Sequence, residues 1–199
     1  MTNPLLEPFD APFGLPPFDK ITDAHFAPAF DAALAEARSR IGAIAADKSM
    51  PGFANVIEAL ELAEGTLDRV SAVFYNLAGA DTTEARQALE RDLAPKMAAF
   101  SSDVLMNADL WRKISALWAA RDTLGLAAEE RRVLELYEQM FRRAGAALDG
   151  AARERMRAIS ERLAVLSTRF SQNLLADERD WFMPLSADDL EGLPEFVVN

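Results

Sequence analysis

The chain has 199 residues, half of them apolar, and carries 32 acidic against 21 basic side chains for a formal net charge of −11. This length is sufficient for one sizeable hydrophobic core, and the acidic balance lacks the cationic surface that nucleic acid or an anionic membrane requires, so neither is expected as a partner. The chain has no cysteine, which excludes disulfides and cysteine-based zinc sites and suits the cytoplasm, the location that we expect.

The first 21 residues combine five prolines with three phenylalanines. Proline lacks a backbone donor and fixes φ, so this density excludes the interior of a helix or a strand. A solvated tail rarely carries three phenylalanines. The segment 1–21 is therefore predicted to be an extended arm that lies across a hydrophobic surface. The residues concerned are Pro4, Pro8, Phe9, Pro12, Phe13, Pro16, Pro17 and Phe18.

Two long helices are predicted next, from apolar side chains that recur every three or four residues. The first begins at Thr22 or Asp23, either of which can cap it, and runs to about Ala46. The second follows the break at 48–53 and runs to about Ala78. Their apolar stripes are Phe26, Phe30, Leu34, Ala37, Ile41 and Ile44, and then Phe53, Val56, Ile57, Leu60, Leu67, Val70, Phe74 and Leu77.

The same period predicts four further helices. The third is capped at Thr82 or Thr83 and is expected to kink at Pro95; a short fourth and a fifth follow, with Gly145 ending the fifth. The sixth, of roughly 28 residues, has the clearest period. Their stripes are Leu89, Leu93, Met97, Phe100 and Leu105; Leu110, Trp111, Ile114, Leu117 and Trp118; Val133, Leu134, Leu136, Tyr137, Met140 and Phe141; and Met156, Ile159, Leu163, Leu166, Phe170 and Leu174.

These elements predict an all-α fold, a bundle of about six antiparallel helices. The helical domain is expected to span 22–178, after the arm at 1–21. In 179–199 the run RDWFMPL breaks the helical period and predicts a short strand-like or extended segment. The apolar EFVV close to the last residue is unusual for the end of a domain, so 179–199 is interpreted as the truncated start of a next segment.

No catalytic, cofactor-binding or metal-binding residue is predicted. A zinc peptidase helix needs two histidines four residues apart, and a serine triad needs an imidazole beside its serine. The chain has one histidine, His25, and the sequence places no partner of those kinds near it. This imidazole is expected either to hydrogen-bond a neighbouring backbone group or to lie at a domain edge.

Other side chains that could take part in catalysis or ligand binding have simpler structural explanations. The carboxylate pairs Glu129 with Glu130 and Asp188 with Asp189 are expected to be solvated or to lie at helix starts. Trp111 and Trp118 follow helical spacing, which favours packing over a ligand groove, whereas Trp181 lies in the break after the last long helix and is of more interest.

Several long segments, taken in order, resemble the N-terminal region of the thimet oligopeptidase family. They are NPLL, PFGLPPFDKITDAHFAPAFDAAL, MPGFANVIEALELAEGTLDRVSAVFYNLAGADT, RFSQNLLA and DLEGLP. Within the family the resemblance is strongest to the bacterial peptidyl-dipeptidases and oligopeptidases A. It extends over essentially all 199 residues, which makes it more specific than any single short motif.

The resemblance implies that the chain is the helical N-terminal part of a zinc metallopeptidase, one wall of a deep channel that admits short unfolded peptides. In the full-length parent it implies a zinc ion held by a His-Glu-x-x-His helix outside this chain, with zinc-activated water attacking the peptide carbonyl and the motif Glu as general base. The partners expected are short peptides and the missing C-terminal catalytic part. This chain alone is expected to be inactive.

A second hypothesis is a complete helical adaptor or protein-interaction domain that acts through a groove between its helices without catalysis. The two hypotheses differ in what lies beyond codon 199. A downstream His-Glu-x-x-His segment is expected under the first, and an immediate stop codon under the second.

Overall fold

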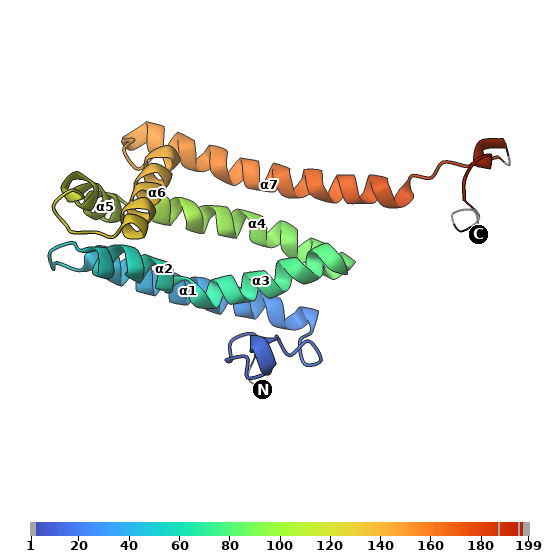
Figure 1. Cartoon of the computed structure of the whole chain (residues 1–199), viewed down its shortest axis with the longest axis horizontal. Coiled ribbons are helices and arrows are strands. Elements are labelled where there is room, and N and C mark those ends of the chain that lie inside the picture. Colours follow the sequence, from blue (N-terminus) through green and yellow to red (C-terminus); the bar gives the residue numbers. More distant parts are fainter. Residues whose placement is uncertain (1–2, 187, 195, 197–199) are drawn as a thin grey trace.

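The computed structural model describes residues 3–186, 188–194 and 196. Every regular element among them is helical (Figure 1), which confirms the all-α class. The α-helices are α1 (Asp23–Ala46), α2 (Ala59–Ala63), α3 (Gly65–Ala80), α4 (Glu84–Leu105), α5 (Ala108–Ala120), α6 (Ala128–Ala144) and α7 (Gly150–Asp180). Shorter turns of helix are η1 (Pro12–Gly14), η2 (Phe53–Glu58) and η3 (Asp188–Leu190).

The predicted second helix is divided into three parts. The π-helix η2 continues directly into α2, and only Glu64 separates α2 from α3. The backbone of Glu64 has φ −101° and ψ 5°, outside the α-helical region. Since η2, α2 and α3 together occupy the place of one predicted helix, the expected number of about six helices is confirmed for the described part of the chain.

The core lies where α1 packs against α3. The stripe predicted for α1 is buried except at Ile44, which is partly buried against the same core. Phe74 of α3 meets two phenylalanines of that stripe edge to face, with ring centroids 5.1 Å from Phe26 and 5.5 Å from Phe30. Such edge-to-face pairs add to the free energy gained by burying the rings.

The C-terminal end of α1 is held by a buried lysine of α5. The Nζ of Lys113 donates to the carbonyl of Ile44 at 2.8 Å and to that of Asp47 at 2.6 Å. The last carbonyls of a helix have no partner within it, so a cation placed there satisfies them and interacts favourably with the helix dipole. Lys113 therefore fixes where α5 lies against α1.

The long helix α7 leaves exposed the apolar stripe that its period indicated. Ile159, Leu163, Leu166, Phe170 and Leu174 are all exposed. The residues turned toward α4 are mostly small or polar and only partly buried: Met156, Ser160, Ala164, Thr168, Gln172 and Ala176. Periodicity identifies an apolar face but does not determine which neighbour covers it.

The N-terminal segment is attached mainly through its first residues. Leu5 is fully buried, and Phe9 packs partly against the core with the guanidinium of Arg69 5.3 Å from its ring centroid. Phe13 is entirely exposed, and Phe18 is about half exposed. Turns and the helix η1 interrupt this segment, so the predicted extended arm is not confirmed.

The described residues after α7 also differ from the prediction. Residues 181–186 have no regular structure, so the expected strand-like character is not confirmed, and η3 follows at Asp188–Leu190. This segment extends away from the helices (Figure 1), with the side chains of Trp181, Phe182, Met183 and Leu185 exposed. No helix in the described part of the chain is both long and apolar enough to cross a membrane.

Asp103 of α4 joins α1 to α7 electrostatically. Its carboxylate accepts from Arg38 of α1 at 2.5 Å and from Arg157 of α7. Burial raises the pKa of Asp103, but the hydrogen bonds from Arg157 and Arg38 outweigh it, and the net pKa lies below the usual value of 3.8. The folded protein therefore keeps this carboxylate charged at a pH where the unfolded chain protonates it.

Asp103→Asn is expected to lower the free energy of unfolding by about 1 kcal/mol at pH 7, a modest amount because the carboxylate is partly exposed and screened by solvent. A carboxylate with a lowered folded pKa stabilises above its unfolded pKa and loses that effect as the pH falls through the folded pKa. Urea unfolding between pH 7 and pH 3 should therefore show the difference from the native chain shrinking below about pH 4. A difference that stays constant across this range would contradict the assignment.

Candidate functional site

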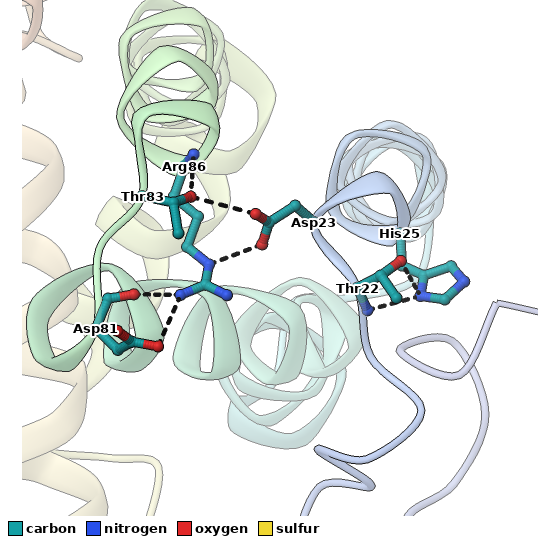
Figure 2. Close-up of polar contacts among 6 residues, drawn as sticks. All are labelled: Thr22, Asp23, His25, Asp81, Thr83 and Arg86. Atoms are coloured by element: carbon teal, nitrogen blue, oxygen red, sulfur yellow. Dashed lines mark hydrogen bonds and ion pairs between the residues drawn. The ribbon is translucent and has the colours of Figure 1, made fainter.

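His25 caps the first helix. The backbone N–H of Thr22 donates to Nδ1 of His25 at 3.0 Å, and the Thr22 hydroxyl lies 3.2 Å from the same nitrogen (Figure 2). Because a backbone N–H can only donate, Nδ1 is the acceptor and the proton of the neutral imidazole is on Nε2. The hydrogen bond to a neighbouring backbone group that the sequence predicted is confirmed.

The residues next to His25 form a second polar cluster, which ties the start of α1 to the start of α4. Nε of Arg86 donates to Asp23 at 2.7 Å, and the same guanidinium reaches the backbone carbonyl and the carboxylate of Asp81 (Figure 2). The Thr83 hydroxyl accepts from the backbone N–H of Arg86 at 3.1 Å and so caps α4. These contacts satisfy helix ends, so we interpret this cluster as structural.

A different feature has the character of a binding site: an apolar groove between α2, α4 and α6. Its volume is about 220 Å³. The walls are mostly aliphatic, aromatic and methionine side chains, a composition typical of sites that hold an apolar group. The lining residues are Leu60, Glu64, Met97, Phe100, Ser101, Val104, Leu105, Tyr137, Met140 and Phe141.

Two of the polar residues that line this groove, Glu64 and Tyr137, lie near Glu61 of α2. The Tyr137 hydroxyl donates to Oε1 of Glu61 at 2.7 Å. Burial raises the pKa of Tyr137, and the hydrogen bond and negative charge of Glu61 raise it further, so the phenol stays protonated. Burial likewise raises the pKa of the Glu64 carboxyl, with Asp68 and Glu61 adding to the effect. The groove therefore joins mostly apolar walls to a polar rim made by Glu64, Tyr137 and the Glu61 carboxylate that Tyr137 binds.

This groove was not predicted from the sequence. Its walls come from three helices that are far apart in the chain, and no local pattern brings them together. One signal was present: Glu61, Glu64 and Asp68 recur at steps of three and four, which places three carboxylates along one side of the helical run. That pattern indicates an acidic face but not the apolar hollow beside it.

The carboxylate pairs lie at helix starts, as predicted. Glu129 and Glu130 occupy the first turn of α6, where Oε2 of Glu130 accepts from the backbone N–H of Ala127 at 2.7 Å. Oδ2 of Asp189 accepts from the backbone N–H and the hydroxyl of Ser186 at the start of η3. The hydrogen bonds from Ser186 lower the pKa of Asp189, as expected for a capping carboxylate.

The three tryptophans differ in burial as their positions in the sequence suggested. Trp111 and Trp118 pack partly against the core from α5, and the guanidinium of Arg121 lies 4.2 Å from the ring centroid of Trp118. Trp181 is largely exposed. The packing role predicted for the first two is confirmed.

The side chains of the described residues do not fit a zinc ion. Zinc sites in proteins are built from histidine, cysteine and carboxylate ligands that converge at about 2 Å from the metal. The sequence has one histidine and no cysteine, and Nδ1 of that histidine already accepts from Thr22. Within the described residues no three histidine, aspartate or glutamate side chains are grouped so that they could hold a metal ion.

Comparison with known proteins identifies relatives among peptidases, although no protein-family model matches the chain. Dipeptidyl carboxypeptidase of Escherichia coli (strain K12) is 36% identical over 174 residues, which are 87% of this chain and 26% of that protein. Oligopeptidase A of the same strain is 27% identical over 200 residues, covering 100% of this chain and 29% of that protein. Probable cytosolic oligopeptidase A of Arabidopsis thaliana is 29% identical over 205 residues, covering 100% of this chain and 28% of that protein. The chain thus spans between a quarter and a third of the length of these curated relatives.

Proposed function

Because this chain is homologous to a region of dipeptidyl carboxypeptidase and oligopeptidase A, peptidases of the thimet oligopeptidase family, we propose that it forms the helical N-terminal part of a peptidase that hydrolyses short unfolded peptides. The observation that carries the proposal is the 36% identity to a dipeptidyl carboxypeptidase over 87% of the chain. Identity spread over so much of the chain is expected when the two helical scaffolds descend from one ancestor.

We propose that the chain forms one wall of the channel in which the parent binds its peptides. The groove between α2, α4 and α6 supports this role, because its volume of about 220 Å³ is sufficient for an apolar side chain and it carries a polar rim. The carboxylates Glu61 and Glu64 and the Tyr137 hydroxyl at this rim offer hydrogen bonds to backbone groups of a bound peptide. In this role the chain binds and orients a peptide and performs no bond cleavage itself.

The zinc ion of the parent is proposed to be bound by residues outside this chain, since the side chains here do not fit the metal. The same proposal makes the C-terminal catalytic part of the parent a partner of this chain. The exposed apolar run Trp181, Phe182, Met183 and Leu185 is the surface that we assign to that contact. The name of the Arabidopsis relative, a probable cytosolic enzyme, supports a cytoplasmic location for the parent.

The test uses the longer parent, cloned from the genomic region that continues past codon 199. A peptidase that cleaves short peptides and contains a downstream His-Glu-x-x-His segment is expected, whereas the 199-residue chain alone should show no turnover and no stoichiometric zinc. In the parent, Met140→Glu, which places a charge on the groove, should raise KM for peptides with apolar side chains by about tenfold and leave kcat nearly unchanged.

Leu136→Glu is the matched control. Leu136 lies on the same helix and is exposed to a similar extent, 48% against 44% for Met140, but it does not line the groove. Equal KM values for the two variants would contradict the channel-wall role. A stop codon immediately after codon 199 would contradict the peptidase parent and favour the adaptor hypothesis.

A further inference from the structure

The groove between α2, α4 and α6 contains a carboxylate that lacks a partner. Glu64 lines this groove and is partly buried. Its side chain forms neither a hydrogen bond nor an ion pair with another described residue. Burial raises the pKa of Glu64, and the negative charges of Asp68 and Glu61 raise it further. A partly buried carboxylate among like charges is unfavourable until a cation approaches it.

The described part of the chain supplies no cation to compensate these three carboxylates. None of them takes part in an ion pair within that part of the chain. A guanidinium does lie against the wall of the groove, since that of Arg38 is 5.3 Å from the ring centroid of Phe100. The carboxylate of Asp103 already binds this guanidinium at 2.5 Å. The groove is therefore suited to a positive charge that another molecule brings.

The rest of the groove suits an aliphatic chain. Its walls include Met97, Phe100 and Met140, and its volume is about 220 Å³. Methionine side chains are flexible and adapt to chains of different shape. Lysine and arginine bury their methylene stems against such surfaces and keep their charged ends at the rim. At this rim the hydroxyl of Tyr137 donates its proton to Glu61, so its oxygen can still accept a hydrogen bond from an ammonium group.

We propose that the groove binds a peptide side chain with an aliphatic stem and a positively charged end, as lysine and arginine have; this rests on the proposed function of the parent. The stem lies along the apolar walls, and the charged end lies between Glu64 and the Tyr137 hydroxyl. A neutral apolar side chain would leave the Glu64 carboxylate unpaired, and an acidic one would be repelled by it. Charge complementarity therefore selects the basic side chain.

Pentylammonium chloride, which has an aliphatic stem and a positive end, tests the site in the 199-residue chain. The methyl resonances of Met97 and Met140 in NMR spectra are expected to shift saturably. That of Met50, which is 89% exposed and does not line the groove, should not shift. Pentanol lacks the charge and methylammonium lacks the stem, so each should bind at least about fivefold more weakly.

Glu64→Gln tests the carboxylate. It should weaken the binding of pentylammonium about fivefold, as expected for the loss of one partly exposed ion pair, and leave the binding of pentanol unchanged. Asp92→Asn is the matched control, because Asp92 is an exposed carboxylate of α4 that does not line the groove, and it should not change either affinity. Equal affinities for pentylammonium and pentanol, or an affinity for pentylammonium that Glu64→Gln leaves unchanged, would overturn the proposal.

Kinetics of the longer parent test whether the peptide is the occupant. Lysine, or norleucine as an aliphatic side chain without the charge, replaces each residue of a short peptide in turn. Where the side chain enters the groove, Glu64→Gln should raise KM for the lysine peptide about fivefold with kcat nearly unchanged, and should not affect the norleucine peptide.

Two results of these kinetics would count against the proposal in different ways. If pentylammonium binds the 199-residue chain but no KM of the parent responds to Glu64→Gln, the parent itself fills the groove, and the inference is overturned while the peptidase function stands. A parent that cleaves none of the peptides would overturn the proposed function and this inference together.

Discussion

Replacing Phe74 by alanine is expected to lower the free energy of unfolding by about 4 kcal/mol, the largest effect of any single substitution considered for this chain. The Phe74 ring is fully buried and meets both Phe26 and Phe30 edge to face. Its removal leaves a cavity between α1 and α3 and abolishes both ring contacts. Urea unfolding at 25 °C, followed by far-UV circular dichroism, measures the loss.

Phe13→Ala is the matched control for this measurement. The Phe13 side chain is entirely exposed in the N-terminal segment, so its removal should change the free energy of unfolding by no more than about 0.5 kcal/mol. A native-like midpoint for Phe74→Ala would show that α1 and α3 do not form the core that holds the molecule together.

The second large effect concerns Lys113. Lys113→Met retains the apolar stem but removes the ammonium that binds the carbonyls of Ile44 and Asp47. Two partly buried carbonyls then lose a charged donor, and we expect the free energy of unfolding to fall by about 2 to 3 kcal/mol. The same urea unfolding experiment measures the difference.

Lys96→Met is the control that separates the effect of burial from the loss of a lysine charge. The Nζ of Lys96 lies 3.1 Å from Asp31, but both side chains are more than half exposed, and an exposed ion pair contributes at most about 1 kcal/mol. If the two lysine variants lost equal stability, the contribution of Lys113 would be no more than that of a surface ion pair, and its role at the end of α1 would have to be abandoned.

The fold was largely predictable because most helices here are amphipathic toward a single core. The stripe from Phe26 to Ile41 in α1 and the residues around Phe74 in α3 repeat every three or four positions and are buried as expected. Helix starts were also predictable, since Thr22 and Thr83 immediately precede α1 and α4, and the Thr83 hydroxyl accepts from the backbone N–H of Arg86. Local rules are sufficient where a helix has one apolar face and that face meets the core.

The prediction from sequence failed where contacts between distant parts of the chain determine which side chains are buried or paired. Nothing local indicates that Leu5 is buried while Phe13 is exposed, because that depends on which turn of the N-terminal segment meets the core. The groove beside Tyr137 requires α2, α4 and α6 to converge. The role of Lys113 arises only when α5 crosses the end of α1, which no local pattern indicates.

The polar inner side of α7 has a consequence for how the molecule opens. None of the described side chains of α7 is buried, so its separation from α4 breaks hydrogen bonds and ion pairs but exposes little of the core. We therefore expect α7 to open locally before α1 and α3 unfold, which hydrogen exchange of its backbone amides would measure. A molecule that covers the exposed apolar side chains of α7, among them Leu163 and Phe170, would hold this helix in place and so raise its local stability.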